Sequence, residues 1–233
     1  MDARLAHANT EEMPLPGQTD IVAEANHRIA NSLALLVGLV RMQAASVRKS
    51  PVPLSNADVR LLLEGVAARI HTISQLHRIL SHVAPEGAVS LKPQLREVTD
   101  ALAAALSSPQ QEMRVEHGGD DCLVLMRQVQ PIGLILCEIF INAMKYAHPA
   151  GVPLSMRVTC NAGADGRLVL SVCDDGVGLP EGFNSRKQGG LGFRVMYSLA
   201  AEIGADLQIE STALGLNVRL SLPASAMTGA RLA

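Results

Sequence analysis

The sequence predicts an α+β protein in which a helical hairpin is followed by an α/β sandwich with helices on one face. Two long stretches before residue 87 show apolar residues at helical spacing, and the remainder alternates short β-rich runs with helical ones. Of the 233 residues 48% are hydrophobic and 18% are charged. The chain can therefore bury a sizeable core and does not have the composition of a disordered protein.

The same composition excludes several classes of function. Aromatic residues make up only 2% and the net charge is −2, so neither a base-stacking platform nor a basic footprint for nucleic acid is expected. The longest apolar run, residues 33–40, is far shorter than the roughly 18 residues that span a membrane. The four cysteines are far apart and form no C-x-x-C pair, which favours a reducing compartment. We therefore expect a cytoplasmic protein with no membrane partner and no leader peptide.

The first half is predicted to be a short arm, residues 1–18, followed by a helical hairpin, residues 19–86. Apolar residues recur at steps of four, three and four along the first helix, at Ile29, Leu33, Leu36 and Val40. Prolines 51 and 53 end that helix, and Ser55 or Asn56 can cap the next one. The second stripe consists of Val59, Leu62, Val66, Ile70, Ile73, Leu76 and Leu80.

These two apolar stripes need partners, because a lone hairpin would leave them in water. Pairing two hairpins into a four-helix bundle is the usual solution, so we expect a homodimer through residues 19–84. The alternative is that the hairpin folds back onto the C-terminal half of its own chain.

Residues 87–224 are predicted to form the α/β sandwich, and residues 225–233 a frayed tail. Helices are expected at residues 91–106, 130–146 and 191–203. Strands are expected at residues 114–117, 122–125, 154–161, 168–173, 206–211 and 216–222.

The first candidate functional residue is His27. On a helix it lies about 160° from Ile29 and next to Glu24 and Asn31, so it faces away from the apolar stripe. Small residues on its side of the helix would admit another domain. From this segment alone, a solvated histidine with no role is an equal interpretation.

A second constellation consists of Glu138, Asn142 and Lys145, which share one face of a helix. An acid, an amide and a cation in line suit a phosphate group with its Mg²⁺, because hard cations prefer oxygen ligands. A solvated helix face with a weak salt bridge is the plainer interpretation.

Two glycine-rich segments complete the set. Asp174 follows a strand and is succeeded by Gly176 and Gly178, which places a carboxylate beside backbone that can approach a flat ligand. Gly190 and Gly192 flank the start of a helix, where free N–H groups favour anions. Each glycine pattern is common by itself, whereas the order and spacing of all four features are specific.

In that order the sequence resembles bacterial sensor histidine kinases, over about residues 19–223. The segment from Glu24 to Asn31 resembles the phosphoacceptor box in which Arg follows His, and the segment from Pro131 to Ala147 resembles the asparagine box. Asp174 to Pro180 and Gly190 to Gly192 resemble the two glycine boxes. The resemblance implies a dimerisation and phosphotransfer hairpin followed by an ATP-binding domain of the Bergerat (GHKL) type.

The resemblance also implies roles for individual residues. His27 would take the phosphoryl group from ATP and pass it to an aspartate of a response-regulator receiver domain. Asn142 would hold Mg²⁺, Glu138 would take the proton of His27 or hold Mg²⁺ through water, and Glu24 is the rival base. The nucleotide would be bound by Asn142, Lys145, Tyr146, Asp174, Gly176, Gly178, Gly190, Leu191 and Gly192, with residues 180–190 as a short mobile lid.

The chain departs from the family pattern at several positions. Ala30 stands where Lys is usual, Ser32 replaces an Asn, and Leu216 occupies a position that commonly carries Thr near the adenine. Leu216 offers no hydroxyl to that site. Only a short arm precedes the hairpin, so we expect a kinase without its own sensor domain and with a separate sensor protein as a further partner.

Two alternatives remain at this stage. In one, the protein relays phosphate through His27 or acts as a scaffold, and its ATP domain is vestigial. In the other, it is a Bergerat ATPase or a serine kinase that silences a sigma factor. The His27 hairpin argues against the second alternative.

Overall fold

The computed structural model describes residues 30, 33–34, 36–45, 47–48, 52–80, 87–108, 111–148, 152–163, 166–212 and 214–223. The predicted phosphoacceptor His27, its neighbour Glu24, the arm 1–18 and the tail 225–233 lie outside the described residues. Within the described residues, no helix is both long and apolar enough to cross a membrane.

The C-terminal half is built on a five-stranded sheet in the order β2-β4-β5-β7-β6. The strands are β2 (Met113–Gly119), β4 (Leu154–Ala162), β5 (Leu168–Asp174), β6 (Asp206–Thr212) and β7 (Gly215–Leu222). Strands β2 and β4 are parallel, and the other neighbours are antiparallel. Two three-residue strands, β1 (Ala88–Ser90) and β3 (Leu123–Leu125), form a separate antiparallel pair.

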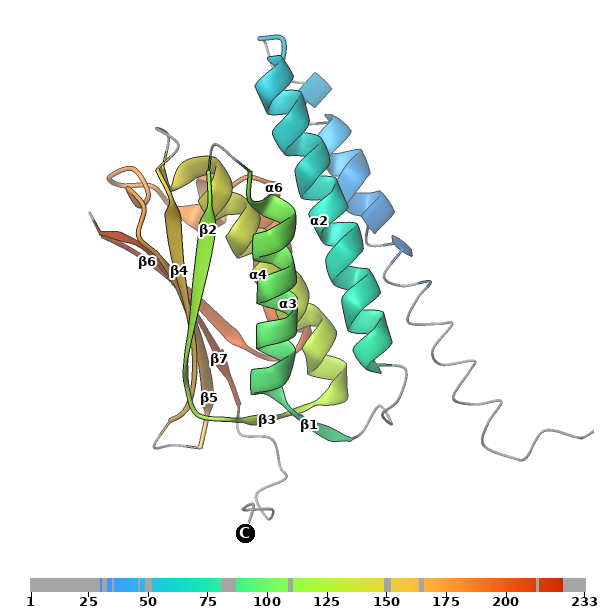
Figure 1. Ribbon diagram of the computed structural model, residues 1–233, viewed down its shortest axis with the longest axis vertical. Coiled ribbons are helices and arrows are strands. Elements are labelled where there is room, and N and C mark those ends of the chain that lie inside the picture. The colour runs from blue at the N-terminus through green and yellow to red at the C-terminus, as the bar shows by residue number, and fades with distance from the viewer. Residues whose placement is uncertain are drawn as a thin grey trace, which may run out of the picture.

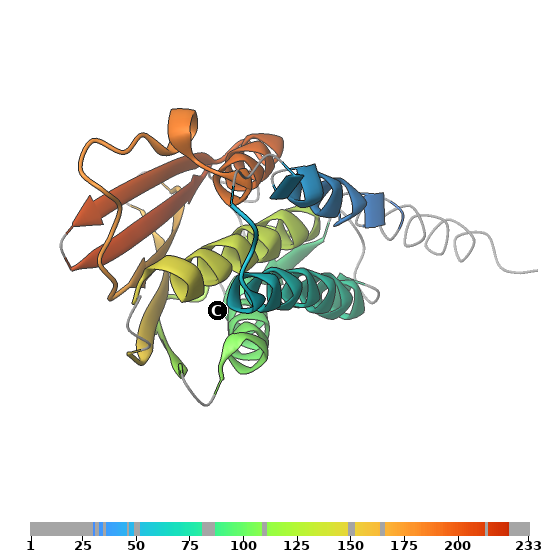
Figure 2. The same cartoon turned by 90° about the horizontal axis from the view of Figure 1, so that it is seen from above.

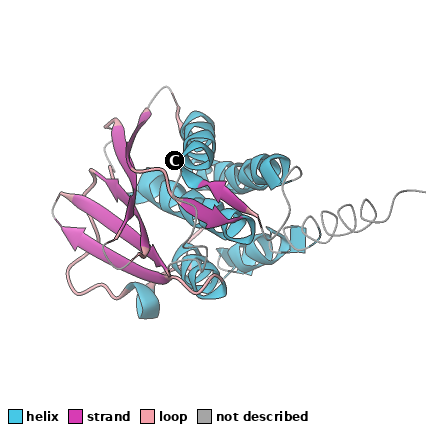
Figure 3. Ribbon diagram, turned by 90° about the horizontal axis from the view of Figure 1, so that it is seen from below, coloured by secondary structure: helices cyan, strands magenta, loops and turns pink. Residues whose placement is uncertain are grey.

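Three helices pack against one face of this sheet, namely α3 (Leu91–Leu106), α4 (Met126–Tyr146) and α6 (Leu191–Glu202). Figure 1 shows the sheet as one layer with these helices beside it, and Figure 3 shows the same division between strands and long helices. Helix α4 is central and buried on almost every side, as expected for a helix with apolar residues all round. The predicted sandwich with helices on one face is confirmed.

A further helical layer covers α4 and α3. Helix α2 (Asn56–Leu80) packs on both of them, and helical residues between 30 and 48 lie beside α2 (Figure 2). The contact of α2 with α4 and α3 is the arrangement of the alternative prediction, in which the hairpin folds back onto its own chain. A second chain is not required for this contact.

The buried face of α2 differs from the predicted apolar stripe. Its buried residues are Gly65, Ala68, Arg69, Thr72 and Leu76, of which only Leu76 belongs to the stripe. The stripe residues Leu62, Val66 and Ile73 are half-buried, and Val59 and Ile70 are 41% and 52% exposed. Small residues at the contact allow two helices to approach closely, which explains why this face was chosen. Only part of the predicted stripe, at Val59 and Ile70, is therefore left exposed.

Most element boundaries agree with the prediction. Helix α3 covers the predicted residues 91–106, while α4 begins at Met126 instead of residue 130. The earlier start is capped by Gln128, whose side chain accepts a hydrogen bond from the Leu125 N–H at 3.0 Å. The short helix α5 (Ser185–Gln188) and strand β1 were not predicted.

Candidate functional site

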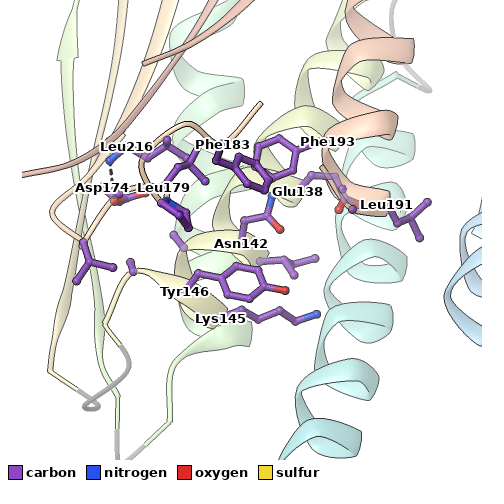
Figure 4. A pocket seen from close by; sticks show the side chains of 18 of the residues that line it. Glu138, Asn142, Lys145, Tyr146, Asp174, Leu179, Phe183, Leu191, Phe193 and Leu216 are labelled. Atoms are coloured by element: carbon purple, nitrogen blue, oxygen red, sulfur yellow. Dashed lines mark hydrogen bonds between the residues drawn. The ribbon is translucent and has the colours of Figure 1, made fainter. Parts of the chain in front are cut away.

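A cavity of about 610 Å³ lies between α4, the start of α6, the loop after β5 and the start of β7. Most of the predicted binding residues line it: Glu138, Asn142, Lys145, Tyr146, Asp174, Gly178, Gly190, Leu191 and Gly192. Figure 4 shows the side chains from α4 following one another along one wall, with Asp174 and Leu216 to one side. The fold thus brings together segments that are far apart in the sequence.

Helix α4 supplies the polar wall of the cavity. The Asn142 side chain is half-buried, and its amide Nδ2 is buried without a hydrogen-bond partner in the described structure. The pKa of Lys145 is lowered, chiefly by burial and then by the charge of Arg69, with Glu138 opposing. A buried amide with unused hydrogen-bonding capacity next to a desolvated ammonium group is suited to a polar, negatively charged ligand.

Asp174 forms the opposite corner, at the end of β5. Its Oδ1 accepts hydrogen bonds from the Gly176 N–H at 3.0 Å and the Leu216 N–H at 3.1 Å. Burial raises the pKa of this carboxyl, and the two backbone hydrogen bonds partly offset the effect. The carboxylate is therefore fixed in direction by the backbone of its own domain.

Gly215 allows the chain to pass close to Asp174. Its φ is +126°, and a Cβ at this position would lie 1.9 Å from the Asp174 carbonyl oxygen. Such a φ and such a distance exclude any side chain. Strand β7 can therefore begin directly beside the end of β5.

The predicted glycines also mark close approaches. Gly178 has a φ of +70°, and a Cβ there would lie 2.4 Å from the Thr212 carbonyl oxygen. A Cβ at Gly192 would lie 3.0 Å from Glu138 Oε2 and 3.2 Å from Asn142 Nδ2, so the first turn of α6 lies against the polar face of α4. Gly176 packs on Ala147 and does not line the cavity.

Asp175, which follows Asp174 in the sequence, does not line the cavity. Asp175 Oδ1 accepts hydrogen bonds from the Ser155 N–H at 3.0 Å and from His148 Nε2 at 2.8 Å. Burial would raise the pKa of this carboxyl, but the hydrogen bonds from Ser155 and His148 outweigh it and lower the pKa. Of the two adjacent aspartates, only Asp174 lines the cavity.

The predicted lid, residues 180–190, contains α5. Asn184 caps this helix through its side-chain oxygen, which accepts from the Arg186 and Lys187 N–H groups. Ser185 Oγ lies 2.7 Å from the Tyr197 hydroxyl, and the Arg186 guanidinium stacks 4.1 Å from the centre of the same ring. The segment is thus fastened to α6 in this structure, and its mobility remains a prediction.

Arg69 is the functional neighbour that sequence reasoning missed. It reaches from α2 to Glu138, with Nε donating to Oε1 at 2.6 Å and Nη2 donating to Oε2 at 2.7 Å. Despite burial, which lowers it, the pKa of Arg69 is raised by the hydrogen bonds and charge of Glu138. The sequence signal that could have identified it is a charged residue that follows Gly65, Ala67 and Ala68 on α2. The cavity wall also contains Leu179 of the predicted glycine box and Phe183 of the predicted lid, together with Gln43 and Phe193, which were not predicted.

The described residues contain no cluster of three or more His, Cys, Asp or Glu side chains that could hold a metal ion alone. A metal here would need ligand oxygens in addition to those of the protein, as Mg²⁺ has when it is bound through phosphates. The side-chain oxygen of Asn142, which lines the cavity, could supply one protein ligand, whereas its unpartnered Nδ2 can only donate to an anion such as a phosphate. The two oxygens of Glu138 both accept from Arg69, so this carboxylate is already paired with a cation where its contact with Mg²⁺ is predicted.

Comparison with known proteins agrees with this geometry. Residues 24–106 match the family model described as histidine kinase, and residues 128–226 match the one described as histidine kinase-, DNA gyrase B- and HSP90-like ATPase. The blue-light-activated histidine kinase 2 of Erythrobacter litoralis is 23% identical over 88% of this chain and 57% of its own length. The sensor histidine kinase PdtaS of Mycobacterium tuberculosis is 27% identical over 87% of this chain and 39% of its own length.

Solved structures show the same fold. The histidine kinase domain of the Erythrobacter litoralis blue-light activated kinase superposes with a TM-score of 0.64 at 22% identity, covering 88% of this chain and 91% of that domain. The larger structure of that kinase gives a TM-score of 0.69 at 21% identity, covering 94% of this chain and 63% of the other.

The fold and the cavity define an ATP-binding domain of the gyrase and Hsp90 type joined to a helical hairpin. The chain belongs to the bacterial sensor histidine kinases with this ATP-binding (GHKL) domain. It spans little more than half the length of one curated relative and less than half of the other.

Proposed function

We propose that this protein is an ATP-dependent histidine kinase that phosphorylates its own His27 and passes the phosphoryl group to an aspartate of a response regulator. The observation that carries the proposal is the convergence of Asn142, Lys145, Asp174 and the start of α6 on one cavity. These groups suit the two ends of ATP, a base with an amino group and a chain of phosphates.

Asp174 is proposed to bind the adenine end. A carboxylate oriented by two backbone N–H groups can accept a hydrogen bond from the exocyclic amine of adenine. Gly178 would let the backbone approach the flat base, since no side chain intervenes there.

Asn142, Lys145 and the first turn of α6 are proposed to bind the phosphate end. Lys145 would supply positive charge, and the N–H groups after Gly190 would donate to phosphate oxygens. Bound Mg²⁺, held by Asn142 and the phosphates, would neutralise charge on the transferring group. Tyr146 and Leu191 would complete the walls around the nucleotide.

The transfer step follows from ordinary imidazole chemistry. At neutral pH an imidazole with a pKa near 6.5 offers an unprotonated ring nitrogen as nucleophile. That nitrogen of His27 would bond to the γ-phosphorus while the bond to the β–γ bridging oxygen breaks and ADP leaves. The proton on the ring would pass to Glu138, or to its rival Glu24. Positioning and charge neutralisation supply most of the catalysis in this class of reaction.

The partners are proposed on the same basis. The exposed stripe residues of α2, including Val59 and Ile70, would pair with those of a second copy to form a homodimer. The receiver domain of a response regulator would then accept the phosphoryl group from His27. A separate sensor protein and a cytoplasmic location remain predictions from the sequence.

The experiment that tests the proposal uses the purified chain alone with γ-³²P-labelled ATP and Mg²⁺. We expect protein-bound label that is lost in acid and retained in alkali, as a phosphoramidate requires. A chain that binds ATP and never takes up label would contradict the kinase proposal. It would favour the relay alternative, for which the apolar Leu216 in the cavity wall is the supporting observation.

A further inference from the structure

One buried ion pair joins the two halves of the molecule. Arg69 belongs to α2 of the hairpin and Glu138 to α4 of the ATP-binding half, and their side chains are only 5% and 2% exposed. Among the described residues they are the two fully buried charged residues. Both carboxylate oxygens accept from the same guanidinium, which is a bidentate geometry.

The guanidinium is seated inside the contact between the helices. Its Nη1 is buried without a partner, and it lies beside Gly65, where a Cβ would come within 3.3 Å of it and 3.7 Å of Ile141. A larger residue at position 65 would displace the arginine. The small face of α2 thus provides the space in which Arg69 reaches Glu138.

The ion pair with Arg69 occupies Glu138, a residue that the proposed phosphoryl transfer needs. Glu138 is the proposed acceptor of the His27 proton, yet its two oxygens are bonded to a fixed cation. In this arrangement both carboxylate oxygens are engaged by Arg69, so Glu138 can take the His27 proton only by giving up this bidentate pair.

The first helix of the hairpin also contributes a residue to the cavity wall. Gln43 lines the cavity, and the sequence predicts His27 on the same helix, sixteen residues earlier. Sixteen residues of helix span about 24 Å. If the helix continues to His27 as the sequence predicts, the phosphoacceptor would lie that far along it from Gln43, and phosphoryl transfer would need a different arrangement of the two halves.

We propose that Arg69 is an interdomain latch. Its ion pair with Glu138 holds the ATP-binding half on α2 in a kinase-off arrangement, and opening the pair frees both Glu138 and the domain that carries it. This inference rests on the proposed kinase function. Two discrete arrangements of a packed interface are the usual basis of such switches. Arg69 acts through Glu138 and is a positioning residue, not a catalytic one.

The test compares Arg69→Met with Arg60→Met in the full chain. Arg60 is a matched control, since it lies on the same helix but forms an exposed i, i+4 pair with Glu64. If the substitution shifts the docking equilibrium by about 1.4 kcal/mol, labelling by ATP should rise about tenfold in Arg69→Met. Because Arg69 itself lines the cavity, binding of a fluorescent ATP analogue is measured for each variant and labelling is compared at saturating ATP; Arg60→Met should behave as the wild type.

A second measurement follows the docking itself. Small-angle X-ray scattering should give a larger radius of gyration for Arg69→Met than for Arg60→Met, with the oligomeric state checked by light scattering. Arg69→Lys keeps the charge but loses the bidentate geometry, so it should label at an intermediate rate. If Arg69→Met does not fold, Arg69→Lys replaces it in both measurements.

Labelling of Arg69→Met at or below the control rate would overturn the latch, because a merely structural arginine predicts a loss. An unchanged radius of gyration would also overturn it. If no variant takes up label although all bind nucleotide, the kinase proposal fails, and the scattering result alone then decides whether Arg69 holds the two halves together.

Discussion

Two carboxylates, the half-buried Asp174 and the buried Glu138, line the same cavity and are held in different ways. Asp174 is fixed by N–H groups of Gly176 and Leu216, which belong to its own domain. Glu138 is fixed by Arg69, which belongs to the hairpin and is 69 residues away in the sequence. The first arrangement persists wherever the ATP-binding half goes, whereas the second exists only while the two halves are packed together.

Asp174 is therefore held in every arrangement of the two halves, whereas Glu138 is held only when they are packed together. A carboxylate held by its own backbone can recognise a ligand at all times, and one held across a domain contact can be switched. The adenine end of the cavity should therefore be insensitive to the packing of α2, while the phosphate end should respond to it.

The largest expected effect comes from breaking the backbone seat of Asp174. Gly215→Ala places a Cβ against the Asp174 carbonyl oxygen at a φ of +126°. We expect a loss of about 3 kcal/mol in the free energy of unfolding, measured by chemical denaturation. Gly182→Ala is the control, since Gly182 also has a positive φ but nothing lies within 4 Å of its added Cβ, and it should lose only about 1 kcal/mol. Equal losses would show that the close approach does not matter.

The next effect comes from the carboxylate itself. Asp174→Asn should weaken ATP binding by about 10- to 150-fold, because hydrogen bonds to charged groups contribute about 1.5–3 kcal/mol. Asp175→Asn should leave affinity unchanged, because that side chain bonds Ser155 and His148 away from the cavity. Calorimetric titration of both variants with a non-hydrolysable ATP analogue checks this. Similar losses in the two variants would contradict the assignment.

A smaller effect is expected at Leu216, whose N–H already holds Asp174. Leu216→Thr keeps that backbone bond and adds a hydroxyl to the cavity wall near the adenine end. A net polar contact of about 0.5–1.5 kcal/mol should tighten ATP binding roughly two- to tenfold. Calorimetry that finds unchanged or weaker binding would place this loop differently relative to the base.

The smallest effect is on the pH dependence of stability. The raised pKa of Asp174 means that its burial lowers the unfolding free energy as pH rises from the ordinary aspartate value of 3.8 through the raised one. The lowered pKa of Asp175 means that its stabilisation is lost as pH falls below 3.8 through the lowered value. Above the raised pKa of Asp174, the Asp174→Asn variant should be more stable than the wild type. Above pH 3.8, the Asp175→Asn variant should be less stable than the wild type. Denaturation curves at several pH values that show the same sign for both would be inconsistent with these environments.

The parts of the site that could be predicted are those whose residues lie close together in the sequence. Glu138, Asn142 and Lys145 share a helix face whatever the rest of the fold does, and Gly178 lies only four residues after Asp174. Their convergence on one cavity follows from the antiparallel pairing of β5 with β7 and the packing of α6 on α4. These are local patterns and common packing rules.

Arg69 could not be predicted in this way. The apolar stripe predicts the buried face of α2, but only Leu76 of that stripe is fully buried, and the face is completed by Gly65, Ala68 and Arg69. An amphipathic pattern identifies which side chains avoid water, but it does not identify which partner covers them. The four residues of α5 were missed for a different reason, because a single helical turn has no periodicity.

The account depends most directly on His27, which lies outside the described residues and is one of seven histidines. Wild type and His27→Gln should be incubated side by side with γ-³²P-labelled ATP and Mg²⁺, with binding of the ATP analogue and oligomeric state measured on the same samples. The account predicts that His27→Gln takes up no acid-labile label while it binds nucleotide and associates as the wild type does. Acid-labile labelling of His27→Gln at a rate comparable to the wild type would contradict it.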